Sequence, residues 1–267
     1  MVPIRIESAD DPRIAAYRSI RERDLAWRHN SFVAEGKVVL NVLFSSSRFV
    51  ADSMLVLENR LGGLSELRAR APEGMPVYVA TQAVMDEIAG FHIHRGILAI
   101  GRRGAEPSVA ELLASLPHEA LVVVPIGISN HDNIGAIFRN AAAFEADAVL
   151  MDETCCDPLY RKAVRVSVGA ALKVPFARGA SAEKLVGDIK AAGFELLALA
   201  GGGRDEIGDI RPGGRKALLL GTEGEGLPAD VMRVARPVRI PMSSGMDSLN
   251  VAAASAIALH RLWSGTR

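Results

Sequence analysis

Three short segments in the second half of the chain hold polar residues whose types and spacing could support chemistry on a hydroxyl or a phosphate group. The first runs from Asn133 to Arg139, the second is the glycine-rich stretch 221–227, and the third is 240–251. An arginine guanidinium donates several hydrogen bonds in a planar fork, and glycines allow close approach of the backbone to a ligand. Each segment lies at the end of an apolar run, so all three could meet at one edge of a sheet.

Each of these polar residues also has a purely structural explanation. An isolated arginine such as Arg139 is most often a surface residue, and Asn133 could simply cap a helix. However, Arg139 lies within the apolar stretch 137–142, where a long cation needs a reason. Ser248 is well placed to cap a following helix, whereas Asn250, predicted inside the first turn of that helix, is harder to explain by capping.

The glycine-rich segments do not match the common nucleotide-binding loops. The stretch 221–227 lacks the Lys-Ser/Thr ending of a phosphate loop, and Glu223 and Glu225 would repel a phosphate. The run 201–203 lacks the Gly-x-Gly-x-x-Gly spacing of a Rossmann fold. The late position of these glycines also argues against the usual methyltransferase sheet, in which the glycine-rich cofactor loop comes early.

The composition is that of a globular protein with one large domain or two modest ones. Of 267 residues, 49% are hydrophobic and 23% are charged, and the formal net charge is zero. No apolar run approaches the roughly 20 residues of a membrane helix and no signal-peptide core is apparent, so we expect a cytoplasmic protein without membrane contact. The only cysteines, Cys155 and Cys156, are neighbours, which excludes a disulfide framework and disfavours a metal site. Because the net charge is zero, any RNA partner would have to be bound by local basic patches.

The first part of the chain alternates helical and strand patterns. A helix is predicted over 11–28, a strand at 32–36 leads to a helix through Leu43, and short strands are predicted at 53–57, 77–80 and 96–100. These elements predict a small α/β domain over residues 1–104. Residues 105–118, bracketed by Pro107 and Pro117, are predicted to be a linker with at most a turn or two of helix.

The remainder, residues 119–267, has the pattern of a larger α/β domain. Its short apolar runs are separated by predicted helices at 134–145 and 182–192, and a helix closes the chain. Runs of this kind are typical of strands buried on both faces of a mostly parallel sheet, whose ligands bind at the carboxyl ends of the strands. The predicted strands are 121–126, 148–151, 196–199 and 217–220.

In order, spacing and position, the three polar segments resemble the signature motifs of the SpoU (TrmH) family of S-adenosylmethionine-dependent RNA ribose 2′-O-methyltransferases. The resemblance implies a C-terminal SPOUT domain with a mostly parallel sheet, in which the chain after Ala217 forms a deep trefoil knot. It also implies that the smaller N-terminal α/β domain is a ribosomal-protein-like RNA substrate-binding domain. Family members are homodimers, and the apolar closing helix 251–263 suits a dimer interface.

The resemblance also assigns site residues. It implies that Arg139 acts on the 2′-hydroxyl to be methylated, and because a guanidinium has a pKa above about 12 we expect it to be a positioned donor and not a free base. The implied catalytic set is Asn133, Arg139, Glu223, Ser248 and Asn250, and the main chain at Gly221, Ile240 and Leu249 is implied to hold S-adenosylmethionine. No metal is required.

Two basic clusters are candidates for RNA contact. Arg161, Lys162 and Arg165 lie in a segment that also follows the family closely, and Arg18, Arg21 and Arg28 share one face of the predicted first helix. Either cluster could instead be an ordinary solvated helix face. The chain departs from the family pattern at two positions, where Asn140 replaces the usual Thr and Glu145 replaces a common Gly.

These observations predict an enzyme that methylates a ribose 2′-hydroxyl of RNA with S-adenosylmethionine as cofactor. Ribosomal RNA is favoured over transfer RNA because the front domain typifies ribosomal RNA enzymes. The alternatives are a transfer RNA ribose methyltransferase and an RNA-binding module whose active site has lapsed, the latter disfavoured by the intact site residues. A small-molecule methyltransferase is disfavoured by the additional front domain.

Overall fold

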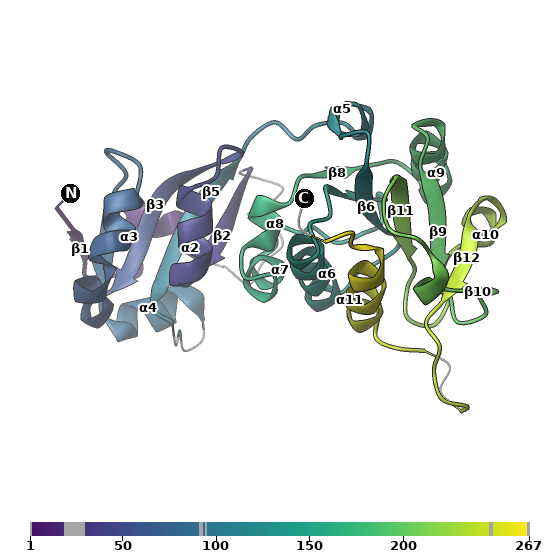
Figure 1. Cartoon of the computed structure of the whole chain (residues 1–267). Helices are drawn as coiled ribbons and strands as arrows, with labels where there is room; N and C mark the ends of the chain where they lie inside the picture. The colour runs from purple at the N-terminus through teal and green to yellow at the C-terminus, as the bar shows by residue number, and fades with distance from the viewer. Residues whose placement is uncertain (1, 19–29, 91–92, 94, 246–247, 266–267) are drawn as a thin grey trace. The chain divides into compact units, whose positions relative to one another are not determined.

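The computed structural model describes residues 2–18, 30–90, 93, 95–245 and 248–265, which form two compact units (Figure 1). The first unit contains residues 1–105 together with 158–173, and the second contains 106–157 together with 174–267. The segment 158–173 thus packs with the first unit, whereas the sequence analysis placed it in the second domain.

The first unit is built on a five-stranded mixed sheet with the order β1-β4-β3-β5-β2. Strands β1, β4 and β3 are mutually parallel, and β5 is antiparallel to both β3 and β2. The strands are β1 (Ile4–Ile6), β2 (Ser31–Glu35), β3 (Phe49–Leu57), β4 (Val77–Ala80) and β5 (Ile97–Arg103). The helices are η1 (Pro12–Tyr17), α2 (Lys37–Phe44), η2 (Glu58–Leu64), α3 (Ser65–Arg70), α4 (Gln82–Ala89), α7 (Arg161–Val166) and α8 (Ala170–Lys173).

The predicted strands and the predicted helix through Leu43 are present in this unit. The predicted first helix, over residues 11–28, was wrong in the part that the structure describes. The described part of 11–28 contains only the short 3-10 helix η1, and Arg18 follows it with extended backbone at φ −72° and ψ 151°. Residues 19–29 lie outside the described residues. Ile14 and Tyr17, whose spacing is typical of a helix with one buried face, are both fully buried in the core of the unit.

A buried ion pair and a close backbone approach hold 158–173 in the first unit. Arg161 on α7 donates to the carboxylate of Glu35 on β2 at 2.8 Å, and the two side chains are only 12% and 6% exposed. Gly169 lies so close to α2 that a Cβ there would be 3.2 Å from the side chain of Val42. Sequence pattern could not reveal this packing because it joins residues 126 positions apart.

The second unit is built on a seven-stranded sheet with the order β10-β12-β9-β11-β6-β7-β8. Every paired neighbour among its described strands is parallel, which confirms the predicted sheet. The strands are β6 (Ala120–Pro125), β7 (Ala148–Met151), β8 (Phe176–Arg178), β9 (Glu195–Leu199), β10 (Asp205–Glu206), β11 (Arg215–Leu220) and β12 (Arg236–Arg239). Of these, β8, β10 and β12 were not predicted, because they are short and because the Arg-Pro-Val-Arg sequence of β12 lacks an apolar run.

Helices cover both faces of this sheet (Figure 1). On one face, α5 (Val109–Ser115), α9 (Ala182–Ala191) and α10 (Ala229–Val234) share a hydrophobic core with alternate strand residues such as Val122 and Leu219. On the other face lie α6 (His131–Ala143) and α11 (Val251–Leu262), and Phe138 of α6 packs edge to face on Phe176 of β8. The fully apolar strands follow from this burial on both faces.

The segment 105–118 is not a simple linker. Ser108 and Glu111 form a reciprocal capping box that starts α5, and Val109, Leu112 and Leu113 contribute to the core of the second unit. The second unit therefore begins about a dozen residues before the predicted boundary at Glu119. None of the helices in the part of the chain that the structure describes combines the length and apolar character needed to cross a lipid bilayer.

Candidate functional site

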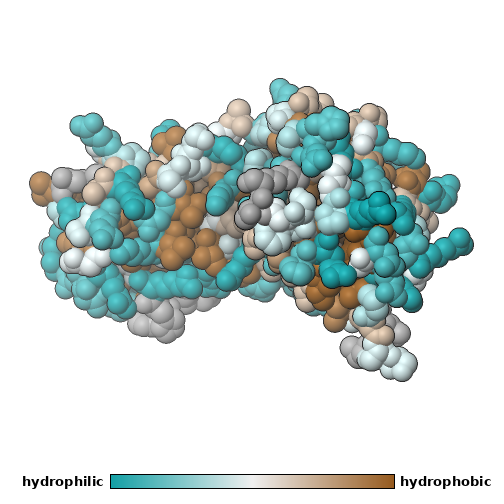
Figure 2. Space-filling view, viewed as in Figure 1, coloured by the Kyte–Doolittle hydropathy of each residue, from teal (hydrophilic) through white to brown (hydrophobic). Residues whose placement is uncertain are grey.

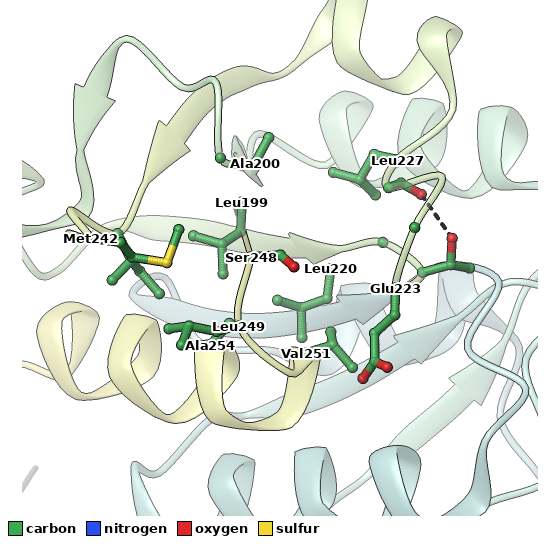
Figure 3. Close-up of a pocket in the computed structure, with 16 residues that line it drawn as sticks. Leu199, Ala200, Leu220, Glu223, Leu227, Met242, Ser248, Leu249, Val251 and Ala254 are labelled. Atoms are coloured by element: carbon green, nitrogen blue, oxygen red, sulfur yellow. Dashed lines mark hydrogen bonds between the residues drawn. The ribbon is translucent and has the colours of Figure 1, made fainter. Parts of the chain in front are cut away.

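A pocket of about 250 Å³ lies at the carboxyl ends of β9, β11 and β12 in the second unit (Figure 3). Its lining comes from three loops, at 199–201, 220–227 and 240–249, and from the first turn of α11. Because neighbouring parallel strands end at the same edge of the sheet, loops distant in sequence converge here. The pocket contains all three residues predicted to bind the cofactor, namely Gly221, Ile240 and Leu249.

The pocket has apolar walls and a polar rim. The side chains of Leu199, Leu220, Met242 and Leu249 face its interior, and Glu223 extends along its edge (Figure 3). Ser248, predicted to belong to the catalytic set, also lines it. The turn after β11 adds Thr222 and three glycines to the lining, so the pocket combines apolar contact with hydrogen-bonding groups.

The turn after β11 is closed by its own backbone. Thr222 and Gly226 form an antiparallel bridge with two hydrogen bonds of 3.2 Å, and the Thr222 hydroxyl donates to the Gly226 carbonyl at 3.4 Å (Figure 3). A Cβ at Gly221 would lie 2.3 to 2.5 Å from the backbone of Gly226 and Leu227. Glycine at 221 is therefore required by the closure of the turn, whereas the sequence analysis attributed it to ligand approach.

Asn133, Glu223 and Asn250 form a closed ring of hydrogen bonds beside the pocket. The Nδ2 atoms of Asn133 and Asn250 donate to the same oxygen, Glu223 Oε1, at 3.0 and 2.6 Å, and Asn250 Nδ2 also donates to Asn133 Oδ1 at 3.0 Å. The three residues come from α6, the turn after β11 and the start of α11. The structure thus brings together three of the five residues predicted to be catalytic.

The helix caps near the ring are not the ones that the sequence suggests. Asn250, and not Ser248, caps α11, because Asn250 Oδ1 accepts from the backbone amides of Ala252 and Ala253. Asn130 caps α6, so Asn133 lies inside the first turn and is not a cap. Since the cap uses Oδ1 of Asn250, its Nδ2 must point away from the helix and toward Glu223.

Arg139 projects from the solvent-facing side of α6. Ile134, Ile137, Phe138 and Ala141, on the opposite side of the helix, are fully buried, whereas Arg139 itself is exposed. The helical period turns the Arg139 side chain away from its apolar neighbours in sequence, so an exposed cation is compatible with the apolar stretch 137–142. Within the described residues its guanidinium has no hydrogen-bond or ion-pair partner, which leaves its donors available to a ligand.

The loop that leads into α6 is braced by Asp152, which sequence reasoning missed. Asp152 is 3% exposed and accepts from the amides of Gly127 and Cys155 and from the Thr154 hydroxyl, at 3.0, 3.2 and 2.6 Å. Its position directly after the apolar run of β7 was the available signal, since polar residues at that edge of a parallel sheet often organise loops. Burial raises the pKa of the Cys155 thiol beside it and raises that of Cys156 to about 12, so both cysteines are held as thiols.

The predicted RNA-binding residues are not equally placed to contact a ligand. Arg161 is committed to Glu35, and burial lowers its pKa, whereas Lys162 is exposed and Arg165 lies 4.0 Å from the Glu35 carboxylate. Arg18 donates to the carbonyls of Ala9 and Asp11 at 2.7 and 3.2 Å. The other two predicted residues, Arg21 and Arg28, lie outside the described residues.

No group of three or more His, Cys, Asp and Glu side chains capable of holding a metal ion occurs among the residues with described positions.

Comparison with known proteins identifies the family. The model of the SpoU rRNA Methylase family matches residues 120–260. An uncharacterized tRNA/rRNA methyltransferase of Mycobacterium bovis is 42% identical over 261 residues, covering 94% of this chain and 88% of that protein. The 23S rRNA (guanosine-2′-O-)-methyltransferase RlmB of Escherichia coli K12 is 29% identical over 201 residues, covering 72% of this chain and 81% of that protein.

Solved structures share the same fold over nearly the whole chain. The crystal structure of an AdoMet-bound rRNA methyltransferase from Sinorhizobium meliloti matches with a TM-score of 0.81 and 25% identity, covering 97% of each chain. The SpoU methyltransferase AviRb from Streptomyces viridochromogenes in complex with AdoMet matches with a TM-score of 0.81 at 20% identity, covering 94% of this chain and 97% of that one, and shows the fold. The second and third motifs line one pocket, and Asn133 of the first motif joins them through its hydrogen bond to Glu223. Because the family model also matches more than half of its length, the chain belongs to the SpoU rRNA methylase family.

Proposed function

We propose that this protein transfers the methyl group of S-adenosylmethionine to a ribose 2′-hydroxyl of ribosomal RNA. The observation that carries the proposal is the meeting of the apolar pocket with the hydrogen-bonded ring of Asn133, Glu223 and Asn250 in a member of this family. S-adenosylmethionine is the cofactor, and RNA methylation is the activity that family membership supports. Ribosomal RNA is preferred because RlmB, a relative, is named for action on 23S rRNA.

The pocket fits an adenine-bearing ligand. Its leucine and methionine side chains offer flat apolar contact for a purine, and the main chain near Gly221, Ile240 and Leu249 offers donors and acceptors that could read the purine edge. The cofactor supplies an electrophilic methyl carbon on a sulfonium. The protein supplies the enclosing turn, whose closure by the Thr222–Gly226 bridge keeps the backbone groups in place without any ligand.

Arg139 and the ring are assigned to the hydroxyl side of the reaction. The exposed guanidinium of Arg139, with no partner among the described residues, is suited to donate to a ribose hydroxyl or an adjacent phosphate oxygen. Its role is to position the oxygen, since a guanidinium rarely gives up a proton. The ring fixes the carboxylate of Glu223 with two amide donors to one oxygen, so the geometry at this edge is set before RNA binds.

The first unit is proposed to bind the RNA substrate, and the second to carry the chemistry. Lys162 and Arg165 remain the best candidates for phosphate contact in the basic segment, because both side chains are more exposed than that of Arg161, which is buried against Glu35. Arg18, Arg21 and Arg28 remain part of the proposal, although Arg18 already donates to two backbone carbonyls. The protein is further proposed to act in the cytoplasm.

The second unit is further proposed to form a homodimer and to contain a trefoil knot. Apolar surface lies over α11 (Figure 2). Ile257 of α11 is 41% exposed, and Leu249, just before this helix, is 37% exposed. An apolar patch beside an active site is suited to cover by a second copy of the chain. The knot is supported by the sheet order, in which β11 lies between β9 and β6 before the chain returns to β12 and finally to α11.

Mass mapping of ribose methylation tests the proposed function. Ribosomal and transfer RNA from cells with and without the gene are compared, and loss of one 2′-O-methyl group from ribosomal RNA is expected. The purified protein with radiolabelled S-adenosylmethionine should restore that group. Restoration only in transfer RNA would establish the alternative substrate, and RNA binding without any methyl transfer would establish a lapsed enzyme.

A further inference from the structure

The alignment of α6 with α11 determines whether the polar ring can close, because Asn133 lies on α6 and Asn250 begins α11. The ring bonds are 2.6 to 3.0 Å long, so an axial shift of one residue, about 1.5 Å, would break them. Something must therefore fix the axial register of the two helices.

Apolar packing between these helices gives only a weak definition of register. The first two turns of α11 are rich in alanine, with alanines at 252, 253, 254, 256 and 258. Small, uniform side chains form shallow ridges, and such surfaces can slide with little change in contact. A specific polar link is the device by which packed helices commonly fix register.

Asn140 provides such a link. Its Nδ2 donates to the backbone carbonyl of Ala252 at 2.7 Å and to the hydroxyl of Ser255 at 2.8 Å. Ser255 is completely buried and its own hydroxyl donates to the same Ala252 carbonyl at 2.7 Å. Both amide protons of Asn140 are thus used on α11, within about a turn and a half of the cap at Asn250. A threonine at this position would have a single hydroxyl proton and could not donate to both acceptors.

We propose that Asn140 is a positioning residue for methyl transfer, fixing the register of α11 on α6 so that Asn133 and Asn250 meet on Glu223. The inference rests on the proposed function for its effect on activity, but its effect on the ring is independent of which RNA is the substrate. Asn140 does not touch the pocket, since it is absent from the pocket lining and acts about two helical turns beyond Asn133.

A matched control exists on the same helix pair. Trp263, just after α11, donates through Nε1 to Glu145, just after α6, at 2.9 Å. Trp263→Phe removes this bond at the far end of the pair, whereas Asn140→Ala removes the link near the ring. Both variants should lower the melting temperature by a few degrees, so stability alone does not distinguish them.

The first test measures the ring directly by NMR of the side-chain amides in the full chain. Asn140→Ala should shift the amide signals of Asn133 and Asn250, and Trp263→Phe should leave them in place. If Asn140→Ala leaves both signals unchanged, Asn140 does not set the register and the inference is overturned, whatever the enzyme methylates. Should Asn140→Ala fail to fold, Ser255→Ala removes one of the two acceptors and should give a smaller shift of the same signals.

The second test is a double-mutant cycle on methyl transfer. Asn140→Ala should lower kcat by about 10- to 100-fold with a smaller change in cofactor affinity, whereas Trp263→Phe should leave kcat unchanged. If Asn140 acts through the ring, adding Asn140→Ala to Asn133→Ala should cost less than about threefold more. Multiplicative losses would show that Asn140 acts independently of the ring. A wild-type enzyme that methylates no ribose would refute the proposed function, while the NMR result would still decide the role of Asn140.

Discussion

The buried pair of Glu35 and Arg161 gives a sharp test of whether the basic segment serves structure or RNA binding. Arg161→Ala would leave the Glu35 carboxylate buried, with Arg165 at 4.0 Å as a remote cation. Removing one partner of a buried pair typically costs about 3 to 5 kcal/mol, and the residual attraction to Arg165 favours the lower end of that range. For a urea m-value of about 2 kcal/mol/M, a loss of about 3 kcal/mol moves the unfolding midpoint of the first unit down by about 1.5 M.

Two controls separate the buried charge from other effects of the substitution. Lys162→Ala, on the neighbouring exposed residue, should change the free energy of unfolding by less than about 0.5 kcal/mol. The double variant Glu35→Met with Arg161→Met should recover most of the stability, because apolar residues of similar volume often replace a buried pair without loss. Urea unfolding followed by circular dichroism measures all three variants. A loss below about 1 kcal/mol for Arg161→Ala, or no recovery in the double variant, would refute the argument.

Further predictions concern the second unit and the RNA contact. Lys162→Ala should reduce the salt slope of single-strand RNA affinity by about 0.7, and Arg161→Ala should leave the slope unchanged in filter-binding assays on folded protein. Gly221→Ala should weaken cofactor binding at least tenfold, as measured by calorimetry, because the added Cβ would collide with Gly226. The control Gly202→Ala, with open space around its Cβ, should bind the cofactor normally. Equal affinities of the two variants would contradict the closed turn. Glu223→Ala should lower the single-turnover rate of methyl transfer by a factor of about 10² to 10³. Glu223→Gln keeps an acceptor oxygen for the ring, so its rate should stay within about tenfold of wild type. Equal losses in the two variants would mean that the charge of Glu223, and not the hydrogen-bonded ring, matters. Because the pKa of Cys156 is raised to about 12, its thiolate fraction at pH 8 is about 10³-fold below that of a free thiol. The pKa of Cys155 is raised as well, so both cysteines should resist alkylation by iodoacetamide until the protein is denatured. Mass spectrometry of the treated protein would show this.

Most of the parallel sheet could be predicted because burial on both faces leaves a direct mark on sequence. The strands at 121–126, 148–151, 196–199 and 217–220 are uninterrupted apolar runs, and each corresponds to an observed strand. The strands at the β10 end of the sheet carry no such mark. The edge strand β10 has only two residues, and β12 beside it contains two arginines and a proline. The prediction of helix over 11–28 failed in its described part because a short 3-10 helix of six residues buries Ile14 and Tyr17 as an α-helix would.

The domain boundary shows what local pattern cannot contain. Segment 158–173 was assigned to the second domain by its place in the chain, yet Glu35 and Gly169 place it in the first unit through contacts more than 100 residues apart in sequence. A truncated chain that begins at Glu119 would lose α5 from the core of the second unit and would leave α7 and α8 without the elements they pack on. A cofactor-binding test of the second unit is therefore better made on the full chain.

The site could be predicted residue by residue, but the connections among its residues could not. Sequence analysis offered capping and pocket formation as competing explanations for the polar residues of the third motif. At Asn250 the two roles depend on each other: Oδ1 caps α11, and this fixes Nδ2 on Glu223 and Asn133. Loss of the cap would free the Asn250 amide to turn away from Glu223. The same side chain therefore fixes both the start of α11 and the geometry of the ring. This explains why an asparagine suits the position better than an aspartate, which could cap the helix but has no proton to donate to Glu223.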